Sequence, residues 1–360
     1  MKISLLLSTF NHAEYLQGCL TKIDEQTYKN YEVLVYNDGS TDNTKKILEE
    51  IKNRNQRYKI FSSNKNQGIK KAINFLIKKI TGDLIFGIAS DDFLVSKTFF
   101  QKTVAIMNDN PLLAGVFAKT EIRSPNLKKK LWVMGNCGVK GVLVPEMAVK
   151  GFFNNDLFVP GSSSIWRTKC FFDAGGFDHR LGSQCDYFIN HVLPMKYGAY
   201  FLDETVAVMR KSGKSLSSAV KNQSFFKNHA LFEKKATAFL GIQRPSNQQW
   251  KTWRKSVINA RLDLELNGYL SKRLEEAFIR IHEWEKDALA PYLGEIKAIY
   301  ETKAKPFNRW LHQEEQKAHR IFDKIAGRIE NPTGEPCDTG LSSSGKKLRD
   351  YLKKITTLLK

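Results

Sequence analysis

Cysteine, acidic side chains and long apolar runs are all scarce in this chain of 360 residues. The five cysteines, at positions 19, 137, 170, 185 and 337, lack the close pairing of a zinc site and the density of a disulfide framework, so we expect reduced thiols and a cytoplasmic protein. The apolar stretch at residues 3–7 is too short for a signal peptide or a membrane span and is expected to form a strand. With 37 acidic against 57 basic residues, the net charge of +20 favours anionic partners such as nucleotide phosphates, nucleic acid or acidic lipid.

The first third of the chain alternates short apolar runs with amphipathic segments. Repeated β-α units of this kind predict an α/β fold with a doubly wound, mostly parallel sheet. Asn11 with Glu14 three positions later has the pattern of a capping box, and Ser40 or Asp42 can cap the next helix. We assign no strand to the basic, turn-rich segment at residues 128–141. The expected strands are residues 2–8, 31–36, 58–63, 83–89 and 113–118, and the expected helices follow Asn11 and Ser40 and cover residues 68–79 and 96–108.

The rest of the chain divides by composition. Residues 221–330 are rich in Glu, Lys, Ala and Leu at helical spacing, which predicts a mainly helical C-terminal extension. Residues 331–345 contain proline, glycine and a serine run and are expected to form a flexible linker. Residues 346–360 have the pattern of a basic amphipathic helix. That helix would lie on an anionic membrane surface, or dock on the protein's own core or on a partner subunit.

Two carboxylates stand together where an apolar run ends. Ser90, Asp91 and Asp92 follow residues 84–89, which predict a buried strand, and the carboxyl ends of strands are where α/β sheets bind ligands. Adjacent carboxylates repel each other and lose hydration when buried, so a cation or a set of donors must offset that cost. Oxygen ligands of this type suit Mg²⁺ or Mn²⁺ holding a phosphate. The alternative is that the pair caps the helix expected after it.

Two further polar segments follow expected strands. Asp38 lies in the run Asn37–Thr44, where Gly39 permits close backbone approach and the carboxylate can accept hydrogen bonds from a nucleobase or ribose. Asn66 and Gly68 precede Lys70 and Lys71 at a helix start, where lysines can face a pyrophosphate. Taken singly, each segment also fits an ordinary turn.

In their order and spacing these segments resemble the family 2 glycosyltransferases. The likeness rests on Ser8–Asn11 with Tyr15-Leu16, on Asn37–Asp42, on Asn66-x-Gly68-x-x-x-Ala72-x-Asn74, and on Gly82-Asp83 with Ser90-Asp91-Asp92-x-Leu94. It covers about residues 1–220, which are expected to form the catalytic domain. The resemblance implies a GT-A fold, a Rossmann-like α/β domain that transfers a sugar from a nucleotide diphosphosugar with inversion at the anomeric carbon.

The resemblance also implies roles for individual residues. Thr9, Asn11 and Asp38 would line the nucleoside pocket, with Asn66, Gly68, Lys71 and Ser90 completing the nucleotide-sugar site. Asp91 and Asp92 match the acidic motif that holds the ribose and a divalent cation, Mn²⁺ or Mg²⁺, although Ala89 replaces the usual leading aspartate. The cation would bridge the two phosphates of the donor.

The acceptor half of the family pattern is matched at Pro160–Ser164, Trp166-Arg167, Gly175–Asp178 and Cys185–Phe188. Cys185 stands where the family usually has glutamate, and Asp186 matches the catalytic base, which would take the proton of the acceptor hydroxyl. Asp186 can alternatively cap the helix that follows it. Trp166, Phe171, Phe172 and Phe177 either form an apolar floor beneath the acceptor or fill the core.

Two family features are absent. The histidine that completes metal coordination has no counterpart in the run Arg210–Ser215, and the Gln-x-x-Arg-Trp signature of the processive members is missing. We therefore expect one sugar to be added per encounter, from a UDP-sugar by preference, to a saccharide or lipid-linked acceptor in bacterial surface polysaccharide synthesis. Attachment to the inner face of the membrane would be peripheral, through the tail.

Two other functions fit parts of the sequence. A metal-dependent nucleotidyltransferase would also use paired carboxylates, but residues 8–16 lack its glycine-rich phosphate loop. A non-catalytic protein that binds nucleotides or nucleic acid fits the positive charge, but the basic residues do not form a cluster interleaved with aromatics, so no nucleic-acid partner is expected. The sequence does not determine the oligomeric state.

Overall fold

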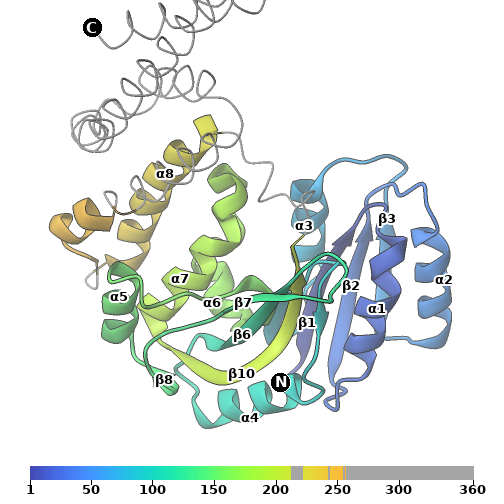
Figure 1. Cartoon of the computed structure of the whole chain (residues 1–360), viewed down its shortest axis with the longest axis horizontal. Helices are drawn as coiled ribbons and strands as arrows, with labels where there is room; N and C mark the ends of the chain where they lie inside the picture. The colour runs from blue at the N-terminus through green and yellow to red at the C-terminus, as the bar shows by residue number, and fades with distance from the viewer. Residues whose placement is uncertain (212–221, 242–243, 254–255, 257–360) are drawn as a thin grey trace, which may run out of the picture. The chain divides into compact units, whose positions relative to one another are not determined.

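A computed structural model describes residues 1–211, 222–241, 244–253 and 256 (Figure 1). The expected linker at residues 331–345, the expected tail helix at 346–360 and most of the expected helical region at 221–330 lie outside the described residues. The strands are β1 (Ile3–Thr9), β2 (Tyr31–Asn37), β3 (Tyr58–Ser62), β4 (Leu84–Gly87), β5 (Phe93–Leu94), β6 (Gly115–Arg123), β7 (Lys130–Met134), β8 (Gly141–Leu143), β9 (Ser164–Arg167) and β10 (Ala199–Arg210). The helices are α1 (Ala13–Asp24), α2 (Thr44–Arg54), α3 (Ile69–Ile77), α4 (Phe99–Asp109), α5 (Pro145–Phe153), α6 (Thr168–Asp173), α7 (Cys185–Tyr197) and α8 (Asn222–Leu240), with 3₁₀ turns η1 (Gly161–Ser163) and η2 (His179–Gln184).

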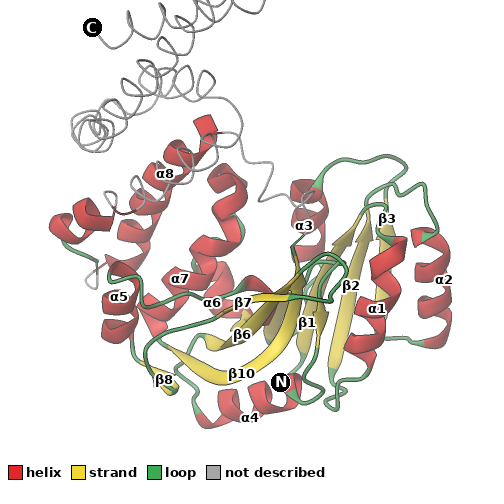
Figure 2. Cartoon of the chain, in the orientation of Figure 1, coloured by secondary structure: helices red, strands yellow, loops and turns green. Residues whose placement is uncertain are grey.

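The strands form one mixed sheet in the order β3-β2-β1-β4-β9-β6-β10-β5, with β7 paired to β6 and β8 paired to β10 (Figure 2). The pairs β1–β2, β1–β4, β2–β3 and β6–β10 are parallel. Strand β9 lies antiparallel between β4 and β6, so that Phe86 is opposite Ile165 near the end of β4. The α/β fold with a mostly parallel sheet is therefore confirmed.

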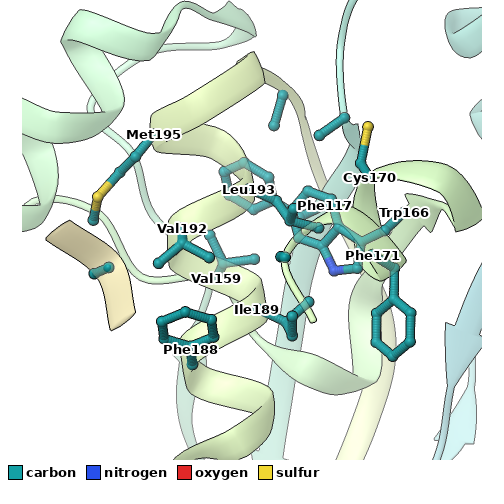
Figure 3. Packing of buried hydrophobic residues seen from close by; sticks show 14 of the residues in the cluster. Phe117, Val159, Trp166, Cys170, Phe171, Phe188, Ile189, Val192, Leu193 and Met195 are labelled. Carbon is teal, nitrogen blue, oxygen red and sulfur yellow. The ribbon is translucent and has the colours of Figure 1, made fainter. Parts of the chain in front are cut away.

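The sheet separates two apolar layers because alternate residues of a strand point to opposite faces. Leu5 and Leu7 belong to one buried cluster together with the buried faces of α1, α2 and α4. Leu6 belongs to the other cluster, which α3, α5, α6 and α7 cover. Figure 3 shows the second cluster around α7, where Phe188, Val192 and Leu193 gather near Phe117 and Trp166.

The first helical residues of the C-terminal region share this core. Phe232 of α8 is fully buried and stacks on Phe152 of α5, with ring centres 5.9 Å apart. Trp250 and Trp253 pack against the same rings and are also buried. Within the described residues, no helix is long and apolar enough to span a membrane.

The structure differs from the expectations in three places. Strand β7 forms within the segment to which no strand was assigned, β8 begins at its last residue, and α4 begins at Phe99, later than expected. The capping box at Asn11 is wrong: α1 begins at Ala13, and the Asn11 side chain accepts a hydrogen bond from the Thr41 backbone instead. A contact with a distant loop has replaced the local one.

Candidate active site

The carboxyl ends of parallel strands β1, β2 and β4 bring three donor-side segments to one edge of the sheet. Thr9 ends β1, Asp38 follows β2, and the turn of Asp91 and Asp92 follows β4. The turn η1 reaches the same edge, because β9 begins opposite the end of β4. The acceptor-side motif at Gly161 and the donor-side motifs therefore share this edge.

Asp38 organises the loop that follows β3. Its buried carboxylate accepts hydrogen bonds from the backbone N–H groups of Gln67 and Gly68, at 2.8 and 2.7 Å, and from the Ser63 hydroxyl at 3.1 Å. Gly39 lies so close to this loop that a Cβ there would meet the Lys65 backbone at 2.5 Å. The loop that carries Asn66 and Gly68 is thus fixed by hydrogen bonds to Asp38. It also packs so closely on Gly39 that a larger residue at position 39 would clash with it.

A second set of side-chain bonds joins the loops after β1 and β2. Asn11 adopts a positive φ of 51° and accepts from the Thr41 backbone N–H at 2.8 Å, while Ser40 accepts from the Asn11 N–H at 3.0 Å. Asp42 accepts from the N–H groups of Ala13 and Thr44, both at 3.0 Å, and so serves the first turns of α1 and α2. The N-cap residue of α2 is Asn43, which makes no side-chain cap bond, so neither Ser40 nor Asp42 is the N-cap, although Asp42 bonds the N–H of the first helical residue, Thr44. Thr9 is buried next to these loops, and its hydroxyl has no hydrogen-bond partner among the described residues.

The start of α3 approaches the acceptor half. Gly68 precedes α3 at a φ of 88°, and Lys70 and Lys71 are exposed in its first turn. Burial lowers the pKa of His179 of η2, and the positive charge of Lys70 lowers it further. The same charge opposes the rise that burial causes in the pKa of Cys185 of α7. Lys70 thus acts electrostatically on the acceptor half.

The acidic pair lies in a tight turn, in which the Asp92 N–H bonds the Ala89 carbonyl at 3.1 Å. Ser90 is buried, and its hydroxyl lies 2.7 Å from Nδ1 of His12. Burial and the neighbouring charge of Asp91 raise the pKa of Asp92 to about 8. The turn leads into β5, and the N-cap of α4 is Thr98, so the acidic pair does not cap that helix.

Arg210, the last residue of β10, holds this turn and was not singled out from the sequence as a site residue. Its backbone N–H donates to the Asp92 carboxylate at 3.2 Å, and its Nε donates to the Asp91 carbonyl at 3.1 Å. The guanidinium also lies over the Tyr15 ring, 4.9 Å from its centre. It thereby fixes the turn without neutralising both carboxylates.

The acidic pair fits a divalent cation by its donor chemistry. Two adjacent carboxylates, one of them buried with a raised pKa, are hard oxygen donors whose repulsion a cation would relieve. Among the described residues, no group of three His, Cys, Asp or Glu side chains converges as a metal site. Further ligands would therefore have to come from phosphate oxygens or water.

Asp186 lies in the first turn of α7, after the N-cap residue Gln184, and its carboxylate accepts from the Tyr187 N–H at 2.9 Å. The residue is exposed to solvent, yet the surrounding protein desolvates the carboxyl enough to raise its pKa above the usual range. A Cβ at Gly161 would lie 3.4 Å from its Oδ2. Burial raises the pKa of the adjacent Cys185 thiol to about 11, so this neighbour is neutral near pH 7.

Asn190 is fixed one helical turn beyond Asp186. Its Oδ1 accepts from Nε1 of Trp166 at 2.9 Å and from the Ser164 hydroxyl at 3.2 Å. Because two donors bind the oxygen, the amide nitrogen must point the other way, and a Cβ at Gly161 would lie 3.5 Å from it. Asp186 and Asn190 thus border the same glycine.

The other acceptor-side residues have structural positions. Asp178 pairs with the Arg180 guanidinium at 2.7 Å and with Lys235 of α8 at 2.9 Å, and it also accepts from the Arg180 N–H. These partners hold the pKa of its carboxyl well below its usual range. Trp166 and Phe171 are buried in the core, whereas Phe172 is 47 % exposed. The alternative that these aromatics fill the core is confirmed for the first two and is wrong for Phe172.

Solved structures support the same architecture. S. aureus TarS has a TM-score of 0.58 at 17% sequence identity, over 77% of this chain and 46% of that chain. Its fragment 1–349 in complex with UDP-GlcNAc has a TM-score of 0.52 at 17% identity, over 72% of this chain and 81% of that one. At this identity the likeness shows the fold, which is of the GT-A type.

Curated relatives are similar over shorter stretches. A glycosyltransferase named GlyA from Streptococcus pneumoniae is 32% identical over 30% of this chain and 16% of its own length. A dolichyl N-acetyl-alpha-D-glucosaminyl phosphate 3-beta-D-2,3-diacetamido-2,3-dideoxy-beta-D-glucuronosyltransferase from Methanococcus voltae is 31% identical over 42% of this chain and 50% of its own. The matches thus span half or less of these relatives. Residues 4–167 match the Glycosyl transferase family 2, so this part of the chain is a family 2 glycosyltransferase domain.

Proposed function

We propose that the protein is an inverting glycosyltransferase that moves a single sugar from a nucleoside-diphosphate sugar, preferably a UDP-sugar, to a saccharide or lipid-linked saccharide acceptor. The observation that carries this proposal is the presence of two separate carboxylate sites at one edge of the sheet. Asp92, in the acidic pair, and Asp186, on α7, both have raised pKa values. Displaced pKa values are typical of catalytic acid and base groups.

The donor is assigned to the loops after β1, β2 and β3. Thr9, Asn11 and Asp38 would border the nucleoside, because they lie at the carboxyl ends of β1 and β2. Asn66, Gly68 and Lys71 lie at the start of α3, where backbone N–H groups and a lysine suit a diphosphate. Ser90 and Asp91 approach from the turn after β4. UDP-GlcNAc bound to the similar fragment of TarS supports a UDP-sugar as the first donor to test.

Asp91 and Asp92 are the proposed cation ligands. A divalent cation, Mn²⁺ or Mg²⁺, would supply the charge that stabilises the departing nucleoside diphosphate. Arg210 holds the turn that presents both carboxylates. His12 holds Ser90 at the start of the same turn.

Asp186 is the proposed base. Its carboxylate takes the proton of the acceptor hydroxyl while the hydroxyl oxygen bonds to the anomeric carbon. The bond from that carbon to the diphosphate oxygen breaks at the same time, and its electron pair leaves with the nucleoside diphosphate. Attack from the face opposite the leaving group inverts the anomeric configuration. A raised pKa makes Asp186 a stronger base than an ordinary aspartate.

The biological setting is also a proposal. Relatives named as a teichoic acid poly(glycerol phosphate) polymerase and a poly-beta-1,6-N-acetyl-D-glucosamine synthase, both of Staphylococcus epidermidis, favour bacterial surface polysaccharide synthesis. A cytoplasmic protein held peripherally at the membrane would meet both a soluble donor and a lipid-linked acceptor. The tail at residues 346–360 is the proposed anchor.

The first test is calorimetric titration of the full chain with UDP, GDP, TDP and CDP, each with and without Mn²⁺. We expect one diphosphate, UDP first, to bind more tightly with the cation. Asp186→Asn should bind that diphosphate normally but lose transfer, and Asp173→Asn, which changes an exposed acid on α6, is the matched control. Absence of binding to all four diphosphates would refute the proposed function.

A further inference from the structure

The hairpin of β6 and β7 carries an uninterrupted positive segment. Between Glu121 and Glu146 the sequence contains no acidic residue but has Arg123, Lys140 and the run Lys128–Lys130. Glu121 pairs with Arg123 and with Lys130, the latter at 3.4 Å, and Asp203 pairs with Lys140. Lys128 and Lys129 at the hairpin turn have no carboxylate partner among the described residues and are exposed.

An aromatic ring accompanies these lysines. Trp132 of β7 is 44% exposed, and the Lys211 ammonium lies 4.7 Å from its ring centre. Lys211 continues β10 alongside β6, since its N–H donates to the Arg123 carbonyl at 2.9 Å. The hairpin surface, defined as Lys128, Lys129, Trp132 and Lys211, therefore combines three ammonium groups with one large ring.

The turn of this hairpin is ordered and is fixed to the acidic pair. Ser124 and Asn126 bond the backbone N–H groups of Lys129 and Lys128, at 3.0 and 3.1 Å. The Arg210 guanidinium donates to the Pro125 carbonyl at 3.0 Å and, through Nε, to the Asp91 carbonyl. One arginine thus joins the hairpin turn to the site proposed for the donor phosphates.

We propose that the hairpin surface binds a negatively charged segment of the acceptor, so that the acceptor is an anionic glycan bearing phosphate, sulfate or carboxylate groups. This inference rests on the proposed function, because it names the acceptor class of the same site. The lysines pair with the anionic groups, and the ring of Trp132 supplies an apolar face for a sugar. Charge complementarity excludes a purely neutral polymer as the preferred ligand of this surface.

A membrane is a less suitable occupant of the hairpin. Stable attachment to a bilayer requires two strong signals, such as a buried apolar face plus a basic cluster. The exposed apolar side chains on β7 are limited to Trp132 and Val133, which are 44% and 38% exposed and alternate in position along the strand. Alternate residues point to opposite faces, so the two side chains cannot enter one bilayer surface together.

The test uses the full chain and fluorescein-labelled dextran sulfate, with neutral dextran of equal length for comparison. Lys128→Gln with Lys129→Gln should weaken dextran sulfate binding about tenfold at low salt and lower the slope of log affinity against log salt by about 1.4, at roughly 0.7 for each lost contact. Trp132→Ala should weaken binding while leaving that slope unchanged. Neutral dextran should not bind.

The control removes the same charge at the other end of the sheet. Lys46 and Lys52 are exposed on α2, which packs beside β3, and Lys46→Gln with Lys52→Gln should bind dextran sulfate almost as the parent does. Equal weakening in this control, or unchanged binding in the hairpin variants, overturns the proposal. Loss of binding to phosphatidylglycerol vesicles with intact dextran sulfate binding also overturns it and assigns the hairpin to a membrane.

Titration with UDP distinguishes failure of the proposed acceptor class from failure of the proposed glycosyltransferase function. The hairpin variants should keep the UDP affinity of the parent, because none of these side chains is assigned to the donor. A parent chain that binds dextran sulfate through the hairpin but binds no nucleoside diphosphate would refute the proposed function. In that case the proposed acceptor class, which depends on it, is overturned as well.

Discussion

Two buried carboxylates at opposite ends of the parallel strands have opposite pKa shifts. At the amino-terminal end, Glu32 of β2 accepts hydrogen bonds from Ser4, Lys59 and Thr81, and Lys2 lies 3.2 Å away. Burial alone would raise the pKa of Glu32, but these partners lower it to about 2. At the carboxyl-terminal end, Asp92 has one backbone donor and a like-charged neighbour, and its pKa rises to about 8.

The opposite pKa shifts indicate that Glu32 stabilises the fold and that Asp92 is placed to bind a ligand. A carboxylate supplied with cations and hydroxyl donors stabilises the fold, and it joins β1, β2, β3 and the segment before β4. A carboxylate left short of partners destabilises the unliganded fold when it ionises, and it provides charge for a ligand to neutralise. Loss of ligand should therefore leave the stability of the amino-terminal end of the sheet unchanged and should alter the stability of the carboxyl-terminal end.

Of these two carboxylates, Asp92 should give the larger change in activity when it is replaced by asparagine. Removing a proposed cation ligand should lower the transfer rate by about 100-fold or more, because charge on the leaving diphosphate loses stabilisation. The same change should leave the thermal unfolding midpoint at pH 8 unchanged or higher, since it removes an unfavourable buried charge. Measurement of initial rates and of thermal unfolding on one preparation checks both. A marked fall in the midpoint would contradict the comparison.

Glu32→Gln should produce the largest change in stability. The lowered pKa of about 2 corresponds to about 3 kcal/mol relative to an ordinary glutamate. A loss of that size should lower the unfolding midpoint by roughly 6–12 °C. At a temperature where both proteins are folded, UDP affinity should match the parent, and Glu49→Gln on the exposed face of α2 is the control. An unchanged midpoint would show that the network contributes little.

The same variant predicts a change in acid sensitivity. Because folding lowers the pKa of Glu32, its stabilising contribution is fully present above the unfolded value near 4.5 and is lost as the pH falls toward about 2. The parent should therefore lose stability over this interval more steeply than Glu32→Gln does. Urea unfolding at pH 6, 4 and 3 measures the difference, which should narrow as the pH falls. A constant difference would assign the effect to packing.

Asn190→Asp should produce the smallest of these effects. The substitution keeps an oxygen to accept from Trp166 and Ser164 but replaces the amide donor near Asp186 with a charge. We expect the transfer rate near pH 7 to change by less than about tenfold, and the acidic limb of its pH profile to move to higher pH because like charges raise the pKa of Asp186, the proposed base. A pH–rate profile tests this, with Ser164→Ala as the control for the loss of one bond. If the pH dependence of the transfer rate is unchanged, Asn190 has only a structural role.

Elements that are marked by a clear pattern of adjacent residues were predicted from the sequence, and features that depend on distant residues were not. Strands β1, β2 and β3 were expected within one residue of their ends because their apolar runs stand between polar turns. Strands β7 and β8 were missed because they are short and adjoin a basic run and glycine-rich turns that indicate a loop, although residues 131–134 of β7 are all apolar. Asn11 was assigned a local cap because sequence spacing does not reveal the tertiary bond to Thr41.

The site was predictable to a different extent. The proximity of Asp38 to Gly68 was implicit in the motifs, but the two hydrogen bonds to the backbone at Gln67 and Gly68 were not. Arg210 contacts the acidic turn from β10, and Glu32 is a single acid in an apolar strand, so neither has a local pattern that would identify it. The assignments of Asp186 and the nucleotide residues stay predictions, which the variants above address.

The position of Arg210 has a consequence for synthesis on the ribosome. Asp92 is made early, but the backbone group that bonds its carboxylate is joined to the chain 118 residues later. Strand β4 likewise cannot pair on the edge away from β1 until β9, which lies about 80 residues downstream, has been synthesised. In a nascent chain, β1, β2 and β3 are therefore synthesised well before Arg210, which bonds the turn of Asp91 and Asp92. The acidic turn is completed later than β1, β2 and β3, and the emerging chain exposes an unpaired edge at β4 until β9 has been made.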